Sequence, residues 1–313
     1  MNKPKSLSVE GKNIDWWIEI SKRVAQNPVL ALHHLWYNTN RVVTDYCLYP
    51  FGLYNYRYRI IFLAGMALGG STWIKNLLAN VPGIFTRFTP MPYDVSYNQN
   101  ICDSAFSHIP KFGNTLFKTH LNPTHNNLEC LYRNGVEKIL VSYRDLRDVI
   151  VSRHHRLINF PKDKNADDFV DYNVLGNEKA MDHSIEIIGE QYVPWIQGWM
   201  DLASKNPNNF HLVRFEDLKI DTKGTFKSIL DYYEITLTDK KIDEIISRCK
   251  GKGSYKKNID SSKVLPFGIS SNFRAGRIGD WRNDMTENQI LRCKELLGST
   301  LIKLGYEKDM SWN

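Results

Sequence analysis

The chain has 313 residues, of which 42% are hydrophobic and 24% are charged, and its formal net charge is +7. A globular chain of this length and composition buries a sizeable core by itself, so a scaffold that depends on disulfides or structural metals is not expected. The positive charge suits an anionic ligand, but it is spread too thinly along the chain to indicate a nucleic-acid partner.

Cysteine spacing and the length of the apolar runs indicate the compartment. The cysteines are scattered, odd in number and never in a CxxC pair, which predicts neither a disulfide framework nor a zinc site. The longest apolar stretch, from Ile60 to Leu68, is far shorter than the roughly 20 residues that span a bilayer. We therefore expect a soluble, cytoplasmic protein without an integral membrane segment. The cysteines are Cys47, Cys102, Cys130, Cys249 and Cys293.

Two regions are expected along the chain. Residues 1–58 are rich in aromatic side chains and irregular in pattern, with a short helix expected at Ile14 to Ala25. We interpret them as an N-terminal extension that packs on the core. Residues 59–313 are expected to form one domain.

An apolar run that is typical of a strand extends from Arg59 to Ala64 and ends at Gly65, and a helical pattern follows from Ser71 to Asn80. Similar strand and helix patterns alternate further along the chain. A tract rich in Lys, Gly and Ser, from Cys249 to Phe273, predicts a long surface loop of the kind that often forms a lid. The other expected strands are Thr115–Lys118, Lys138–Tyr143 and Phe210–Phe215, and the other expected helices are Leu146–Ile158, Gly224–Tyr233 and Thr286–Leu304.

These strands are continuously apolar and separated by helices, which predicts an α/β fold with a central parallel sheet covered by helices on both faces. Ligands of such sheets bind outside the carboxyl ends of the strands. Residues at those ends are therefore the candidates for chemistry.

The first candidate is the glycine-rich segment from Gly65 to Thr72, between the first strand and its helix. Backbone N–H groups of such a loop can converge on a phosphate at the helix N-terminus. In the nucleotide-binding pattern GxxxxGK[ST], however, the place of the lysine is taken by Ser71, which disfavours an ATP or GTP hydrolase. The alternative is a tight turn without a ligand.

The second candidate pairs Arg144, at a strand end, with Ser152, two turns into the following helix. A guanidinium group and a hydroxyl placed in this way can clamp a second phosphate. The alternative is that Arg144 and its neighbouring arginines are surface charges paired with Asp145 and Asp148.

The third candidate is formed by Lys118 and His120, which lie two residues apart at a strand end and so share one face. Histidine is the usual general base for a hydroxyl near neutral pH, although a lone histidine is more often structural. The fourth candidate is the segment from Asn272 to Asn283, where arginines and glycines precede Trp281. It can wrap a phosphate, or it can be a basic surface loop that Trp281 anchors.

Together and in this order, the four segments resemble those of the PAPS-dependent sulfotransferases, especially the cytosolic type that sulfates small molecules. PAPS is 3′-phosphoadenosine 5′-phosphosulfate, and PAP is the product left after sulfuryl transfer. The resemblance runs from about residue 60 to 286. It rests on Gly70-Ser-Thr-Trp73 (family GTTW), Lys118-Thr-His120 (KTH), Arg144 with Ser152, Trp195 to Trp199 (a tryptophan-containing helix), Arg214-Phe-Glu-Asp-Leu (YEDL), and Arg274, Gly276 and Gly279-Asp-Trp281 (RKGxxGDWK).

The resemblance implies a single α/β domain with a P-loop-like strand, loop and helix, and a site that uses no metal. It makes His120 the general base and Lys118 the local cation for the leaving phosphate. The implied PAPS-binding residues are Gly69, Gly70, Ser71 and Thr72 for the 5′-phosphosulfate, Trp73 for adenine, and Arg144, Ser152, Arg274 and Gly276 for the 3′-phosphate. Phe215 and Ala275 stand where the family usually has a tyrosine near adenine and a lysine beside the 3′-phosphate.

The largest departure is Leu68, at the position of a family lysine that contacts the leaving oxygen. Lys118 alone, Lys75 or a loop cation can supply that charge, or turnover can be slow. Of the family's dimer motif, KxxxTVxxxE, only Thr286 is retained, so a monomer is as well supported as a dimer.

The sequence thus predicts transfer of a sulfuryl group from PAPS to a hydroxyl or an amine of a small acceptor such as a specialised metabolite (EC 2.8.2 type). The alternatives are a PAP- or PAPS-binding protein with impaired catalysis and an ATP-dependent P-loop phosphotransferase. The acceptor pocket is expected at the N-terminal region, residues 88–108 and residues 159–172. Within these, Phe88, Tyr93, Tyr97 and Phe106 can line an apolar pocket, and Asp94 and Asp103 can attract a cation.

Overall fold

The structure is a computed structural model that describes Trp36 and residues 39–86, 99–107, 109–159, 172–249 and 276–312. The chain divides into two compact units, Met1–Leu53 and Tyr54–Asn313. In the first unit, a π-helical turn, η1 (Thr44–Leu48), leads into a 3₁₀ turn, η2 (Tyr49–Phe51). The helix expected at residues 14–25 lies outside the described residues, and the packing of residues 1–58 on the core stays a prediction.

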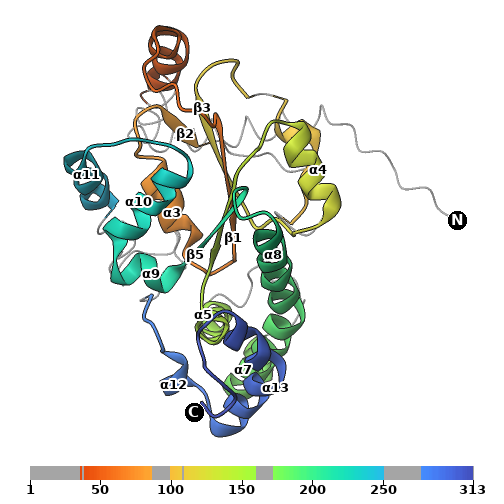
Figure 1. Ribbon diagram of the computed structural model, residues 1–313. Coiled ribbons are helices and arrows are strands. Elements are labelled where there is room, and N and C mark those ends of the chain that lie inside the picture. The colour runs from red at the N-terminus through yellow and green to blue at the C-terminus, as the bar shows by residue number, and fades with distance from the viewer. Residues whose placement is uncertain are drawn as a thin grey trace, which may run out of the picture. The chain divides into compact units, whose positions relative to one another are not determined.

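The second unit is built on five parallel strands in the order β2-β3-β1-β4-β5 (Figure 1). In the centre, Ala64 of β1 lies opposite Thr119 of β3 and Val141 of β4. The predicted parallel sheet is therefore confirmed, although the sequence patterns did not predict β2, which has three residues. The strands are β1 (Ile60–Gly65), β2 (Ile84–Thr86), β3 (Asn114–Thr119), β4 (Ile139–Tyr143) and β5 (Phe210–Arg214).

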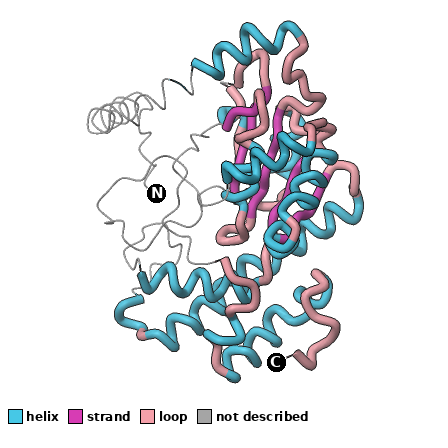
Figure 2. Tube along the Cα trace, turned by 90° about the vertical axis from the view of Figure 1, so that its left-hand side faces the viewer, coloured by secondary structure: helices cyan, strands magenta, loops and turns pink. Residues whose placement is uncertain are grey.

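Helices cover both faces of this sheet, because alternate residues of its strands are apolar on both sides. In β1, Ile61 and Leu63 belong to one buried cluster, the α3-side core, whereas Phe62 and Ala64 belong to another, the α8-side core. Figure 1 shows α3 (Ser71–Leu78), α10 (Thr222–Tyr232) and α11 (Asp239–Cys249) on the first side, and Figure 2 shows helices lying over the strands. The second side carries α4 (His125–Arg133), α5 (Leu146–Asn159) and α8 (Val193–Lys205).

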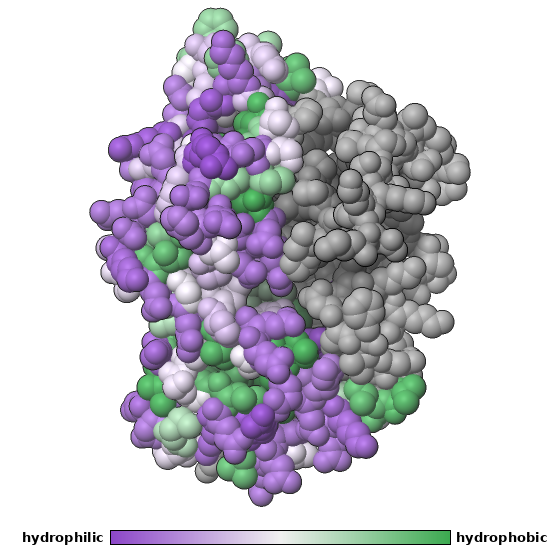
Figure 3. Space-filling view, turned by 90° about the vertical axis from the view of Figure 1, so that its right-hand side faces the viewer, coloured by the Kyte–Doolittle hydropathy of each residue, from purple (hydrophilic) through white to green (hydrophobic). Residues whose placement is uncertain are grey.

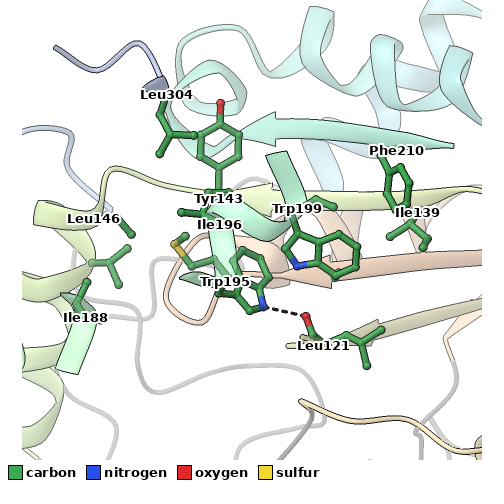
Figure 4. Close-up of a cluster of buried hydrophobic side chains, with 14 of the residues drawn as sticks. Leu121, Ile139, Tyr143, Leu146, Ile188, Trp195, Ile196, Trp199, Phe210 and Leu304 are labelled. Carbon is green, nitrogen blue, oxygen red and sulfur yellow. Dashed lines mark hydrogen bonds between the residues drawn. The ribbon is translucent and has the colours of Figure 1, made fainter. Parts of the chain in front are cut away.

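Tryptophans of α8 anchor the α8-side core. Trp199 is fully buried, and the indole N–H of Trp195 donates to the carbonyl of Leu121 just beyond β3 at 2.8 Å (Figure 4). A buried indole N–H usually finds a hydrogen-bond partner, and this bond ties α8 to the end of β3.

Among the remaining helices, the sequence predicted the closing one but not α6 (Tyr172–Leu175), α7 (Asn177–Ile187), α9 (Phe215–Ile220) or α12 (Trp281–Asp284). The closing helix, α13 (Glu287–Lys303), begins at a capping box in which Thr286 and Gln289 bond to each other's backbone N–H groups. No helix of the described ranges combines the length and the apolar character needed to cross a membrane. On the face seen in Figure 3, hydrophilic side chains cover most of the described surface, with apolar ones in small groups between them. The described residues also contain the turns η3 (Asp103–Ala105) and η4 (Ile188–Tyr192).

Candidate active site

The candidate site lies at the carboxyl edge of the sheet. Since all five strands are parallel, the segments that follow β1, β3, β4 and β5 meet at the same edge. These segments contain the glycine-rich loop, His120, Arg144 and Phe215 respectively. The fold therefore gathers candidates that are up to 150 residues apart in the chain (65 to 215).

The glycine-rich loop is held by its own backbone. The N–H of Met66 donates to the carbonyl of Ser142 in β4 at 2.8 Å, and the N–H of Gly69 donates back to the Met66 carbonyl at 3.0 Å. The amides of Ser71 and Thr72 begin α3 and have no intrahelical acceptor, so they point out of the helix toward the loop. Together with the helix dipole, they form a place for an anion.

Gly70 is required in this loop for two reasons. Its φ of 79° is left-handed, and a Cβ there would lie 2.3 Å from the ring of Phe215. The close approach brings the loop against the residue that follows β5. The loop after β1 and the start of α9 thus form one wall of the site.

Leu68 occupies the loop position at which the resemblance expects a lysine. It has a φ of 61°, which is rare for a bulky side chain, and it packs, partly buried, against the α8-side core. Its side chain supplies apolar contact and no charge. The positive charge near this loop must come from other residues.

Lys118 and His120 meet at the end of β3. The Nζ of Lys118 lies 3.2 Å from the Nε2 of His120, and the Nδ1 of His120 lies 2.5 Å from the carbonyl oxygen of Gly65. A carbonyl only accepts, so Nδ1 carries the proton and the lone pair of the ring is on Nε2. Burial, followed by the nearby charge of Lys118, lowers the pKa of His120 to about 3. Burial and the charge of Lys75 lower the pKa of Lys118 to about 8.

Arg144 and Ser152 are also brought together. One guanidinium nitrogen of Arg144 donates to the Ser152 hydroxyl at 3.0 Å, and the other donates to the carbonyl of Arg277 at 2.7 Å. The guanidinium carbon lies 4.8 Å from the centre of the Phe215 ring. Phe215 in turn meets Trp73 edge to face, with ring centres 6.3 Å apart. Arg144, Phe215 and Trp73 thus line one side of the loop.

The C-terminal segment reaches this side of the site as well. Gly276, with a left-handed φ of 53°, accepts a hydrogen bond at its carbonyl from the Nζ of Lys219. Arg274 and Ala275, which the sequence assigned to the 3′-phosphate, lie outside the described residues. Their roles stay predictions.

A buried ion network that the sequence patterns did not predict lies directly after β4. Arg147, only 2% exposed, pairs with Asp145 at 2.7 Å and with Glu307 at 2.5 Å. Its guanidinium group also lies against the rings of Trp281 and Trp312, at 4.1 and 4.5 Å. The alternative interpretation of the sequence, in which the arginines after this strand pair with aspartates at the surface, is therefore right about the pairing. It is wrong about the location, because the pairs are buried. A run of charges after a buried strand was the available signal.

The side chains named for the acceptor pocket are only partly described. Phe106 is buried in the α8-side core, with its ring centre 5.2 Å from that of Phe117. Asp103 is exposed and pairs with Arg133 at 3.0 Å. Phe88, Tyr93, Tyr97 and Asp94 lie outside the described residues.

Known proteins resemble the chain over this same region. Residues 59–305, which are well over half of the chain, match a protein family described as "Sulfotransferase domain". The chain belongs to the sulfotransferase family. This confirms the expected family and its class, a PAPS-dependent sulfotransferase.

Individual sulfotransferases match at moderate identity. Cytosolic sulfotransferase 12 of Arabidopsis thaliana is 26% identical over 250 residues, which are 73% of each chain. Flavonol 3-sulfotransferase of Flaveria bidentis is 26% identical over 271 residues, 77% of this chain and 81% of the relative. Sulfotransferase 6B1 of Danio rerio is 27% identical over 192 residues, 59% of this chain and 58% of the relative. The match to the Danio rerio protein thus spans less than two thirds of that relative's length.

Solved sulfotransferase structures share the fold. Mouse sulfotransferase SULT7A1, complexed with PAP, superposes with a TM-score of 0.58 at 20% identity, covering 78% of this chain and 84% of that one. Retinol dehydratase, in complex with androsterone and PAP, gives a TM-score of 0.52 at 16% identity over 79% and 82% of the two chains. The sulfotransferase α/β fold with its P-loop-like strand, loop and helix is therefore confirmed for this chain.

Proposed function

We propose that this sulfotransferase moves the sulfuryl group of PAPS to a hydroxyl of a small-molecule acceptor, with His120 as the general base. The observation that carries the proposal is the Arg144–Ser152 pair beside the glycine-rich loop. It offers a second anion site in addition to the amides of Ser71 and Thr72, which matches the two phosphate positions of PAPS. Flavonol 3-sulfotransferase, named for a small hydroxylated molecule, supports an acceptor of this size.

The residues on this side of the loop fit the nucleotide. The Nε of Arg144 is buried and has no hydrogen-bond partner among the described residues, which leaves donor capacity for an anion. The half-buried ring of Trp73 would supply the aromatic surface that an adenine ring needs, and the buried ring of Phe215 packs against it. Arg144 and Ser152 would hold the 3′-phosphate, and the first turn of α3 would hold the 5′-phosphosulfate.

Proton transfer is assigned to the Nε2 atom of His120. The bond from Nδ1–H to the Gly65 carbonyl fixes the ring tautomer, so the lone pair of Nε2 can take the proton of the acceptor hydroxyl. The ammonium group of Lys118 donates to this same lone pair at 3.2 Å, so the acceptor hydroxyl would replace it there while the Lys118 charge neutralises the leaving phosphate oxygen. Transfer of this type depends mainly on in-line positioning and on neutralisation of developing charge.

A second candidate function is a PAP- or PAPS-binding protein that turns over slowly. Leu68 is the observation that favours it, because its side chain packs on the α8-side core and supplies no charge to the site. Separately, the acceptor group can be an amine instead of a hydroxyl. Turnover with a panel of phenols, alcohols and amines decides between these candidates.

Calorimetric titration with PAP, ATP and adenosine 5′-phosphosulfate tests the two phosphate positions without knowledge of the acceptor. We expect PAP to bind most tightly. Arg144→Ala should weaken PAP binding by about 1.5 to 3 kcal/mol, the value of a charge-assisted hydrogen bond, which is roughly ten- to 150-fold in affinity. Tighter binding of ATP than of PAP, or an unchanged PAP affinity in Arg144→Ala, would contradict the assignment.

The pH dependence of turnover tests the roles of Lys118 and His120. With a pKa of about 8, Lys118 is charged below that pH and loses its charge above it, so kcat/KM for PAPS should fall as the pH rises through 8. With a pKa of about 3, His120 stays neutral from pH 5 upward and should add no acidic limb there. The measurement is a pH–rate profile with an alcohol acceptor that does not itself titrate. Lys118→Arg, which stays charged, should lose the basic limb; an unchanged limb would assign it to another group.

A further inference from the structure

Asp148 is a buried carboxylate beside Arg144, and the proposed function gives it no role. It is 1% exposed and lies in the first turn of α5. Arg144, Asp148 and Ser152 follow one another at intervals of four residues, so Asp148 and Ser152 lie one turn apart on the same helix face. Asp148 therefore lies between Arg144 and Ser152 along the chain, on the helix face that also carries Ser152.

The contacts of Asp148 join two parts of the site. Its Oδ2 accepts from the N–H of Gly279 at 2.9 Å, and its Oδ1 accepts from the N–H of Trp281 at 3.3 Å. The same Oδ2 lies 3.6 Å from the Nη2 of Arg144, which also donates to the carbonyl of Arg277. One carboxylate thus ties the C-terminal segment to the guanidinium group at the end of β4.

Such a carboxylate is costly to bury. Burial raises its pKa against the opposing effects of Arg144 and the Gly279 and Trp281 amides, and an ionised carboxylate inside a protein needs close partners. Each oxygen of Asp148 already accepts a hydrogen bond from one of these amides, and Oδ2 also forms an ion pair with Arg144. The carboxylate therefore acts through the groups it holds rather than by touching a ligand.

We propose that Asp148 is a positioning residue for 3′-phosphate recognition, which aligns Arg144 and the backbone of residues 276–281 with each other. This inference rests on the proposed function, because it takes Arg144 as the 3′-phosphate ligand. The two terminal nitrogens of Arg144 donate to Ser152 and Arg277, and Asp148 lies 3.6 Å from one of them, so these three groups together hold the guanidinium group. An asparagine would keep the shape but would present an NH₂ group to one of the two amides, so a donor would face a donor.

Asp148→Asn tests the proposal through the ratio of the dissociation constants of AMP and PAP, which differ by the 3′-phosphate. PAP affinity should fall about ten-fold, as on loss of a charge-assisted contact, while AMP affinity stays near that of the wild-type protein. In turnover, the KM for PAPS should rise while kcat changes little. An unchanged ratio, or an equal loss for PAP and AMP, overturns the proposal.

Asp145→Asn is the matched control. Asp145 is a buried carboxylate three residues earlier, but its side chain serves Arg147. This variant should lose stability and keep the AMP to PAP ratio. Hydrogen exchange of the wild-type protein adds a measurement that does not depend on a variant folding: the amides of Gly279 and Trp281 should be protected, and free exchange overturns the proposal. A wild-type protein that binds PAP no better than AMP overturns the proposed function itself.

Discussion

Replacement of His120 by alanine is expected to lower sulfuryl transfer about 10²- to 10⁴-fold, the usual contribution of a positioned general base, and to leave PAP affinity nearly unchanged. The reason is that the Nε2 of His120 acts on the acceptor hydroxyl, whereas the phosphate ligands proposed for PAP lie on the glycine-rich loop and on Arg144. Steady-state turnover and PAP titration of the same preparation measure the two quantities separately.

His125→Ala is the control for this experiment. His125 is exposed on α4, where it pairs with Glu129 one turn further along, and its loss should change neither quantity. If His120→Ala loses PAP affinity as strongly as turnover, His120 is structural and supports the loop through Gly65. If the variant keeps nearly full activity, another group is the base.

Replacement of Arg147 by alanine is expected to lower the free energy of unfolding by about 3 to 5 kcal/mol, the cost of removing one partner from a buried ion pair. Asp145 and Glu307 would both lose their bonds to the guanidinium group, and Asp145 would remain buried without it. The space that Arg147 fills beside the rings of Trp281 and Trp312 would also be left partly empty. Denaturant unfolding measures the change.

Arg292→Ala provides the comparison on the surface. Arg292 makes two close contacts, with Glu186 and Glu295, but all three side chains are exposed, and solvent screens such pairs. The free energy of unfolding of the Arg292→Ala variant should stay near that of the wild-type protein. Equal effects of the two substitutions would show that burial gives the Arg147 network no special importance.

The main elements were predictable because their patterns are local. The continuously apolar runs of β1 and β4 predicted buried strands, and the structure places them within one residue of the expected bounds. The closing helix was expected at Thr286–Leu304, and the structure has it at Glu287–Lys303. The strand β2, with three residues, carries too little pattern to be recognised in this way.

The candidate site was predictable in part. Given parallel strands, residues at strand ends must share one edge of the sheet, so the meeting of His120 with the carbonyl of Gly65 follows from the topology. The bond between Arg144 and Ser152 was also predictable, because Arg144 lies at a strand end and Ser152 lies two turns into the helix that follows. Because parallel sheets bind ligands at this edge, the same residues were predicted to form the ligand site.

By itself, the sequence determined the alternation of strands and helices, the parallel sheet and the residue types at its carboxyl edge, because periodicity and strand ends are local properties. Only the tertiary structure decided which charges are buried and with whom they pair. Arg147 meets Glu307 across 160 residues, and Asp148 meets the amide of Gly279 across 131. No local pattern marks such partners, since burial and pairing depend on how distant segments pack.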